Sequence, residues 1–526
     1  MTTSPALPND LDAMRALLLA ERARHAEEIA ARQAVLARKD GDIDKLRLII
    51  KALQRHRFGR RSEAIDPDQL VFALEEVEQT IAAAEAEQEK IDRAAAASRP
   101  GMRKANRGAL PAHLPRVEIV IDVADKSCPC CAGAMHVIGE DRAERLDVIP
   151  AQFRVLVVRR PKYACRSCEE GVVQAPAPAR LVESGIPTEA LIAQVVVAKY
   201  ADHLPLYRQA QIYARQGIAL DRSTLADWVG RTARELKPVH TRLAERLNAS
   251  TKLFADETTA PVLDPGRGRT KTGQLWAYAR DDRPWGGTDP PAVVYRYAPD
   301  RKGERPAAHL AGFAGVLQVD GYAGYRALAD TGTIQLAFCW SHVRRRFYEM
   351  VAAGHAPIAA EALARINTVY ELEREIRGCT AAARREVRQT CARPIIDALK
   401  PWLEAQLAAA SKKSTLAQAI RYALSRWDGL TGFLDDGRIE IDSNVVERAI
   451  RPIALNRKNA LFAGSDGGGE QWGILASLIE TCKLNSVDPQ AYLADVLTRL
   501  VDGHPMSRID DLLPWAYAKP AIAAAA

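Results

Sequence analysis

Apolar residues near the start of the chain follow a helical period. Between residues 10 and 56 they recur every seven residues within a strongly charged stretch, and two more leucines fill the alternate seam. The repeat consists of Ile29, Leu36, Ile43 and Ile50, and the alternate seam of Leu46 and Leu53. This spacing is typical of a coiled coil. Because Arg32 and Lys39 interrupt it, a helix packed on its own domain is the alternative. We expect a helical, coiled-coil-like region over residues 1 to 97.

Residues 98 to 116 form a basic linker rich in Pro and Gly, which marks a domain boundary. A second helical pattern occupies residues 179 to 250. Within it, "LYRQAQIYARQGIALDRSTLADWVGRTARE" contains two helical stretches hinged at Gly217, and Asp221 or Ser223 is placed to cap the second. This is the pattern of a helix-turn-helix, but any compact helical bundle contains similar hairpins. Recognition of DNA and simple packing both remain open for this segment.

From residue 251 the pattern changes to strands. The stretches "TKLFADETTAPVL", "GQLWAYARD" and "PAVVYRYAP" are separated by turns rich in Gly, Pro and Asp. A helical stretch near residues 303 to 312, the strands "GVLQV" and "IQLAF", and a helix from about residue 341 follow. Three strands in a meander, a helix, a strand, and further strand and helix units describe the order of a ribonuclease H-like fold. Residues 251 to 348 would form the first part of this core, and 439 to 485 its final helix region.

The remaining segments complete a multidomain α+β organisation. Residues 349 to 438 have a helical pattern and would be an insertion before the final helix of the core, and residues 486 to 526 a helical C-terminal region. A chain of 526 residues is too long for one hydrophobic core. Its 48% hydrophobic and 26% charged residues are typical of soluble globular proteins. No apolar run near the start is long enough to span a membrane, so we expect a cytoplasmic protein without membrane contact.

Positive charge points to an anionic partner. The formal net charge of +7 is modest for this length, but basic residues gather in short runs in separate segments, such as "RRPKYACR", "HVRRRF" and "RPIALNRKN". Several separate basic runs suit a long polyanion better than a small acidic ligand.

Five of the nine cysteines lie in two clusters within residues 117 to 178, "CPCC" at 128 to 131 and "CRSC" at 165 to 168. Each cluster holds one Cys-x-x-Cys pair beside a strand-like stretch, "VEIVIDV" and "FRVLVVRR". Thiolates at this spacing converge on a tetrahedral ion, as in a zinc ribbon. Disulfides are the rival interpretation, which a cytosolic location disfavours. The predicted ligands of a structural Zn²⁺ are Cys128, Cys131, Cys165 and Cys168, with Cys130 excluded by its spacing.

Three acids stand at positions where the predicted fold would bring them together. Asp256 lies on the first strand of the core, and Asp320 follows the fourth strand, which is its neighbour in a ribonuclease H-like sheet. Two adjacent carboxylates repel each other unless a cation lies between them. A helix packed across the sheet can supply a third carboxylate, and Glu447 is the candidate. Hard oxygen ligands without a neighbouring His or Cys cluster favour Mg²⁺ or Mn²⁺.

Glu447 also has an ordinary local explanation. It follows Asn444 by three residues, which is the spacing of a helix N-cap pair, and it precedes Arg451 by four, which is the spacing of a surface ion pair. From this stretch alone, a carboxylate on the helix surface is the favoured interpretation.

Several motifs together resemble the IS-sixty-six family of insertion-sequence transposases, the TnpC type, which belong to the DDE (Asp-Asp-Glu) transposases. The matching stretches include "ADET", "GQLWAY", "VDGYAGY", "CWSHVRRRF", "IDSNVVERAIRPIALNRKNALFAGSDGG" and "LIETCKLNSVDPQAYLADVLTRL". The resemblance covers nearly the whole chain and implies that Asp256, Asp320 and Glu447 form the catalytic triad. One departure is that Ser443 stands where the family usually has the first of two Asn, a substitution compatible with a helix cap.

Four other features are weaker candidates for metal or phosphate binding. Glu257 should face away from Asp256 on its strand, and Asp442 is a possible helix cap or second-shell group. Cys339 and His342 form "CWSH", which lacks a second metal-binding pair nearby and for which the resemblance implies a structural role. The stretch "GSDGGGE" lacks the Gly-Lys-Ser/Thr ending of a phosphate loop, so no ATPase is expected.

The sequence thus predicts a transposase that binds and cuts the ends of its element and joins them to target DNA. Asp256 would bridge two Mg²⁺ ions, with Asp320 and Glu447 each completing one of them. The residues expected to hold DNA phosphates are Arg448, Arg451, Arg457 and Lys458. Double-stranded DNA, a homo-oligomeric partner, accessory proteins of the same element and association with the nucleoid are further expectations. The alternatives are an inert DNA-binding regulator and a nuclease that cuts without joining.

Overall fold

The computed structural model describes residues 12 to 33 in part, 153 to 164, 172 to 182, 186 to 264, 269 to 330, 332 to 460 and 462 to 517. The chain divides into two compact units, residues 1 to 156 and 157 to 526. The described residues between 12 and 33 are helical, as the periodicity predicts, and Ile29 is half exposed. The other heptad positions, from Leu36 onward, lie outside the described residues. Among the helices that are described, none is long and apolar enough to cross a membrane.

A short antiparallel hairpin, β1 (Lys162–Ala164) and β2 (Val172–Gln174), flanks the second cysteine pair. The prediction that "FRVLVVRR" is a strand is wrong, because residues 153 to 160 belong to no strand and pairing begins only at Lys162. This apolar run has no partner strand in the described part of the chain, and Val155 is 88% exposed. All four predicted zinc ligands lie outside the described residues.

A helical segment follows, made of α3 (Glu189–Tyr200), α4 (Leu206–Arg215) and α5 (Arg222–Asn248). The predicted hinge is confirmed, since Gly217 has a φ of +79° between α4 and α5 and this conformation suits glycine. Asp221 rather than Ser223 occupies the N-cap position of α5. Buried residues such as Trp228 and Leu236 of α5 join this segment to the main hydrophobic core.

The predicted strands are confirmed and form one five-stranded sheet of order β5-β4-β3-β6-β7. They are β3 (Lys252–Asp264), β4 (Arg269–Arg280), β5 (Ala292–Ala298), β6 (Gly315–Val319) and β7 (Ile334–Phe338). β3, β4 and β5 are antiparallel, whereas β6 runs parallel to β3 and β7 parallel to β6. The connections between β5 and β7 carry α6 (Glu304–His309) and α7 (Arg326–Ala329). The fold is therefore mixed α+β, with the fourth strand of the predicted order placed beside the first.

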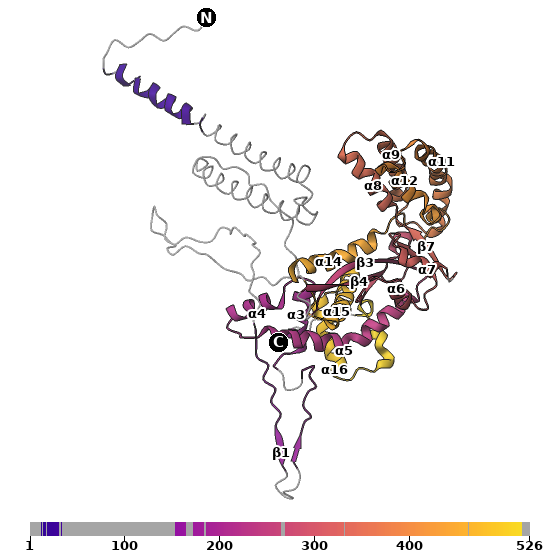
Figure 1. Ribbon diagram of the computed structural model, residues 1–526. Coiled ribbons are helices and arrows are strands. Elements are labelled where there is room, and N and C mark those ends of the chain that lie inside the picture. Colours follow the sequence, from indigo (N-terminus) through magenta and orange to yellow (C-terminus); the bar gives the residue numbers. More distant parts are fainter. Residues whose placement is uncertain are drawn as a thin grey trace. The chain divides into compact units, whose positions relative to one another are not determined.

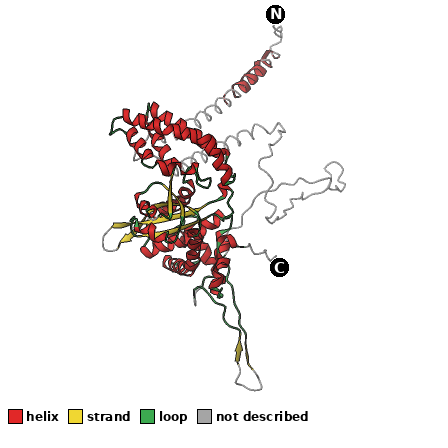
Figure 2. Ribbon diagram, turned by 90° about the vertical axis from the view of Figure 1, so that its right-hand side faces the viewer, coloured by secondary structure: helices red, strands yellow, loops and turns green. Residues whose placement is uncertain are grey.

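Helices make up the rest of the described chain (Figure 1). After β7 come α8 (Trp340–Ala353), α9 (Pro357–Glu375), α10 (Ala381–Val387), a π-helical turn (Arg388–Ala392), α11 (Arg393–Ala409), α12 (Thr415–Leu424) and α13 (Trp427–Thr431). The chain then returns to the sheet with α14 (Asn444–Ala460), α15 (Asp466–Leu484) and α16 (Pro489–Val501). The helices from α8 to α12 gather beyond β7 (Figures 1 and 2) and share a second hydrophobic core with Val316 of β6 and Ala337 of β7.

The helix α15 covers the edge of the sheet. Its Ser477 hydroxyl accepts a hydrogen bond from the Tyr295 N–H at 2.8 Å, and its Thr481 hydroxyl bonds both the N–H and the carbonyl of Val293. Gly473 permits this approach, since a Cβ there would lie 3.0 Å from the Tyr295 carbonyl oxygen. These contacts satisfy backbone groups of Val293 and Tyr295, which would otherwise lie on an open edge of the sheet.

Candidate active site

Asp256 and Asp320 lie side by side on neighbouring parallel strands. The last residues paired between β3 and β6 are Phe254 and Gln318. Asp256 lies two residues after Phe254 within β3, and Asp320 lies two residues after Gln318, directly beyond the end of β6. Because side chains alternate along a strand, both carboxylates emerge on the same face of the sheet. The structure therefore brings together the two predicted aspartates.

The helix α14 covers this same face. Asp256 is opposite Ala277 on β4, which is opposite Tyr295 on β5, so these three side chains share one face. The Tyr295 hydroxyl donates to the carbonyl of Ala449 on α14. Glu447, in the first turn of α14, is thereby carried to the face that holds the two aspartates.

The electrostatics of Asp256 reflect this convergence. Burial, followed by the negative charges of Asp320, Glu257 and Glu447 in that order, raises the pKa of its carboxyl to about 7. A hydrogen bond of 2.8 Å from the Glu257 N–H opposes the increase. A bound cation would stabilise the ionised form of a carboxylate that its acidic neighbours disfavour.

The loop after Asp320 is fixed by the helical segment between β7 and α14. The Asp320 carboxylate accepts the Tyr322 N–H at 2.9 Å, and the Tyr422 hydroxyl of α12 donates to the Asp320 carbonyl at 2.8 Å. Arg426 reaches the Gly321 carbonyl and also lies over the Tyr422 ring. Sequence reasoning missed Tyr422 and Arg426, because nothing local to either residue indicates that α12 folds back onto this loop.

Residues 438 to 441 lead into α14 and are bonded to several elements. The Gln318 side chain of β6 pairs with both the N–H and the carbonyl of Glu440 at 2.9 Å. The buried Lys252 donates to the Arg438 carbonyl at 2.8 Å, and burial lowers the pKa of this lysine to about 8. The Trp340 N–H bonds the Ile441 carbonyl at 3.0 Å. The start of α14 is thus held against the sheet and α8.

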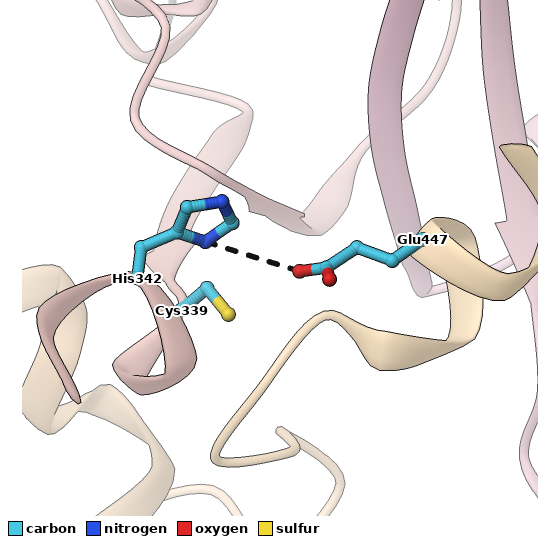
Figure 3. Close-up of side chains that lie close together, drawn as sticks. All are labelled: Cys339, His342 and Glu447. Atoms are coloured by element: carbon cyan, nitrogen blue, oxygen red, sulfur yellow. Dashed lines mark ion pairs between the residues drawn. The ribbon is translucent and has the colours of Figure 1, made fainter. Parts of the chain in front are cut away.

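The surroundings of Glu447 do not match its local explanation. The helix already includes Asn444, so the predicted N-cap role of Asn444 is wrong; Asp442 instead accepts hydrogen bonds from the Asn444 N–H and side-chain amide. Among the ion pairs of the described residues, none joins Glu447 to Arg451. The Glu447 carboxylate lies 3.4 Å from the hydroxyl of Ser443 and 3.9 Å from Nδ1 of His342 (Figure 3).

The four predicted phosphate-binding residues differ in their exposure. Arg448, Arg451 and Lys458 are exposed on α14. Arg457 instead bonds the side chains of Thr258 and Thr259 on β3, which holds the helix against the sheet.

Glu257 lies on the other face from Asp256, as its position in the strand predicts. Its carboxylate pairs with Arg301 and accepts a hydrogen bond from Tyr325 at 3.1 Å. It belongs to a cluster of aromatic rings around Trp276 rather than to the aspartate pair.

Residues 184 to 471, more than half of the chain, match the sequence model of a family described as "Transposase IS66 family". The chain belongs to the IS66 transposase family. Three further matches agree with this assignment: an "IS66 C-terminal element" at residues 477 to 515, a "zinc-finger binding domain of transposase IS66" at 125 to 169, and "Transposase C of IS166 homeodomain" at 45 to 119. The zinc-finger match spans both cysteine pairs and supports a structural zinc in this IS66 family member.

The IS66 family member also has full-length relatives in Sinorhizobium fredii. It is 48% identical to the protein described as uncharacterized protein y4qI, over 98% of both chains. It is 46% identical to uncharacterized protein y4jD, over 90% of this chain and 94% of the relative. A third, uncharacterized protein y4hP, is 38% identical over 91% and 89%.

Proposed function

We propose that this chain is a DNA transposase that cleaves the ends of its insertion sequence and joins them to target DNA, with Asp256, Asp320 and Glu447 as the catalytic acids. The observation that carries the proposal is the register that sets Asp256 and Asp320 side by side, under the helix that bears Glu447. The strand order and directions support a ribonuclease H-like fold for this sheet. Membership of the IS66 transposase family supports the reaction class.

The three acids fit a magnesium site by their chemistry. Their donors are carboxylate oxygens, which Mg²⁺ and Mn²⁺ prefer. Burial and then the neighbouring negative charges raise the pKa of Asp256, and bound cations would relieve the repulsion between these charges. Asp256, Asp320 and Glu447 would hold these ions. When bound, such ions would activate water, and later a DNA 3′-hydroxyl, for attack on phosphorus and would neutralise the leaving oxygen.

The protein's own groups position these carboxylates before DNA arrives. The Glu257 N–H fixes the Asp256 carboxylate, and the Tyr322 N–H fixes that of Asp320. Ser443 holds the Glu447 carboxylate from the turn before it. Such preorganisation avoids the free-energy cost of arranging the charges during the reaction.

Binding of the element ends would precede cutting and would involve other parts of the chain. The zinc-finger segment and the helical pair α4 and α5 are candidates for DNA recognition, and the exposed Arg448, Arg451 and Lys458 would hold phosphates beside the catalytic acids. Arg457 would act indirectly, by holding α14 against β3.

The proposal is tested by incubating the protein and Mg²⁺ with labelled DNA that carries the ends of its element. We expect cleavage at the ends and joined strand-transfer products. Asp256→Asn, Asp320→Asn and Glu447→Gln should each lower cleavage by roughly a hundredfold or more, because each keeps the size of the side chain but removes a ligand charge. End binding, measured separately by gel shift, should change little.

Glu470→Gln is the matched control, since Glu470 is an exposed carboxylate on α15, and it should cleave normally. Full cleavage by Glu447→Gln would contradict the assignment of the third acid. Cleavage without joined products would indicate a nuclease, and end binding without cleavage by the wild-type protein would indicate a DNA-binding regulator.

A further inference from the structure

A second group of potential metal ligands adjoins the proposed catalytic acids. Cys339 is the N-cap residue of α8, His342 lies in the first turn of that helix, and Glu447 lies in the first turn of α14. The Cys339 sulfur, one ring nitrogen of His342 and one oxygen of Glu447 all lie within 4.8 Å of one another. Figure 3 shows the three side chains converging from the two helices. The sequence could not show this group, because its third member comes from the far side of the helical insertion.

The distances suit a tetrahedral cation after small side-chain rotations. Bonds of about 2.3 Å to sulfur and about 2.0–2.2 Å to nitrogen and oxygen place neighbouring ligands of a tetrahedral zinc ion roughly 3.4–3.6 Å apart. Nδ1 of His342 is 3.9 Å from the Glu447 carboxylate. The three groups therefore need to approach by only a fraction of an ångström to about one ångström.

One ring nitrogen of this group is available for a ligand, whereas the Cys339 sulfur and the Glu447 carboxylate also contact the Ser341 hydroxyl, at 2.8 and 3.5 Å. Nδ1 of His342 is buried and has no hydrogen-bond partner in the described part of the protein, which is costly unless another group satisfies it. Cys339 is 2% exposed, and its sulfur accepts a hydrogen bond from the Ser443 N–H at 3.2 Å. Cysteine binds metals as a thiolate, and a bound cation itself favours this form.

We propose that Cys339, His342 and Glu447 bind a thiophilic divalent cation such as Zn²⁺, with a fourth position open to solvent. A thiolate and an imidazole favour zinc over magnesium, so this site would select a different ion from the carboxylates beside it. Because Glu447 would be shared by the two sites, zinc withdraws it from Asp256 and Asp320. The site is thus inhibitory, and this second half of the inference rests on the proposed function.

Binding is tested with the full-length protein and Co²⁺, which reports thiolate ligation by its absorption. The difference spectrum between wild type and Cys339→Ser removes any contribution from cobalt at the zinc finger. We expect a thiolate charge-transfer band and the visible bands of tetrahedral cobalt in this difference. Bound zinc after desalting should be lower by one ion per chain in Cys339→Ser and in His342→Ala than in wild type.

Cys379→Ser is the matched control, because Cys379 is an exposed free cysteine away from this group, and it should bind as much metal as wild type. Melting temperatures of all variants identify any that fail to fold. The His342 side chain is 26% exposed, so its substitution should disturb folding less than that of the buried Cys339. Equal zinc content in wild type, Cys339→Ser and His342→Ala, with no cobalt difference spectrum, would overturn the proposed site.

Inhibition is tested by titrating Zn²⁺ into the Mg²⁺-dependent cleavage of element ends. Wild type and Cys379→Ser should lose activity at a zinc concentration about tenfold or more below that needed for His342→Ala. Equal sensitivity would overturn the inhibitory role, even if the metal binds. Complete lack of cleavage by wild type without zinc would contradict the proposed function instead, while the cobalt and zinc measurements would still decide whether the site exists.

Discussion

Asp256 combines burial with three acidic neighbours, and this has a consequence for stability in the absence of metal. Its pKa of about 7 in the folded protein exceeds its ordinary value of 3.8, so the folded state holds the proton more tightly than the unfolded state does. The resulting stabilisation is complete below about pH 4 and is lost as the pH rises through 7.

We therefore predict that the metal-free protein melts at a lower temperature at pH 8 than at pH 5. Asp256→Asn should remove most of this pH dependence and stabilise the metal-free protein at pH 8 by roughly 2–4 kcal/mol, because an amide is neutral at both pH values. Thermal melting in EDTA measures the effect, and Mg²⁺ should raise the melting temperature of wild type more than that of the variant. A wild type that is equally stable at both pH values would contradict the prediction.

At the residue scale, the sequence predicted the aspartates better than the glutamate. Asp256 and Asp320 each end a recognisable apolar run, and strand order alone makes them neighbours. The local pattern around Glu447 favoured a surface carboxylate, and only the family resemblance reversed this interpretation. The groups that hold the site, such as Gln318 and Tyr422, were not predicted. Their hydrogen-bond partners lie about a hundred residues away in the sequence, so no local pattern reveals them.

At the scale of elements, a buried charge network joins the helical insertion to the segment before α14. Arg388 pairs with both carboxylate oxygens of Glu373 at 2.7 Å and donates to the Phe433 carbonyl. Arg384 bridges Glu373 and Glu440. Both arginines are 1% exposed, and removing one partner of a buried pair leaves an uncompensated charge.

Arg388→Met should accordingly destabilise the protein by roughly 3–5 kcal/mol. Arg385→Met, which changes an exposed arginine on the preceding helix α10, should cost about 0.5 kcal/mol or less. Urea denaturation followed by tryptophan fluorescence measures both. Equal stability of the two variants would show that the network contributes little.

The elements themselves were largely predictable. The strands of the core and the two helices around Gly217 follow clear periods. The stretch "FRVLVVRR" shows the limit of this reasoning, because its apolar, valine-rich run is typical of a strand, yet a strand forms only where a partner is present. The contacts of α15 with the edge of β5 were also beyond prediction, since Ser477 and Thr481 look like ordinary helix residues in the sequence.

For the whole molecule, the most direct prediction is that the four paired cysteines bind zinc. The purified protein should contain about one tightly bound zinc per chain, apart from any ion at Cys339. Cys128→Ser or Cys165→Ser should lose this zinc and expose residues 117 to 178 to proteolysis, whereas Cys130→Ser should retain it. Metal analysis and limited proteolysis measure the two effects. Freshly reduced protein without zinc would contradict the prediction, which concerns residues outside those described.

The position of α14 and α15 late in the chain also sets an order during protein synthesis. The ribosome completes all five strands well before it reaches Glu447, because the whole helical insertion lies between. Until α14 and α15 emerge, one face of the sheet is not packed against α14 and the backbone of β5 is not bonded to α15. A sheet without these contacts should be unstable. The helix α14 carries the third acid, Glu447, and α15 follows it directly. These two helices also complete the fold. A growing or truncated chain thus gains a stable sheet only as it gains Glu447, so under the proposed roles incomplete copies cannot cut the DNA from which they are being expressed.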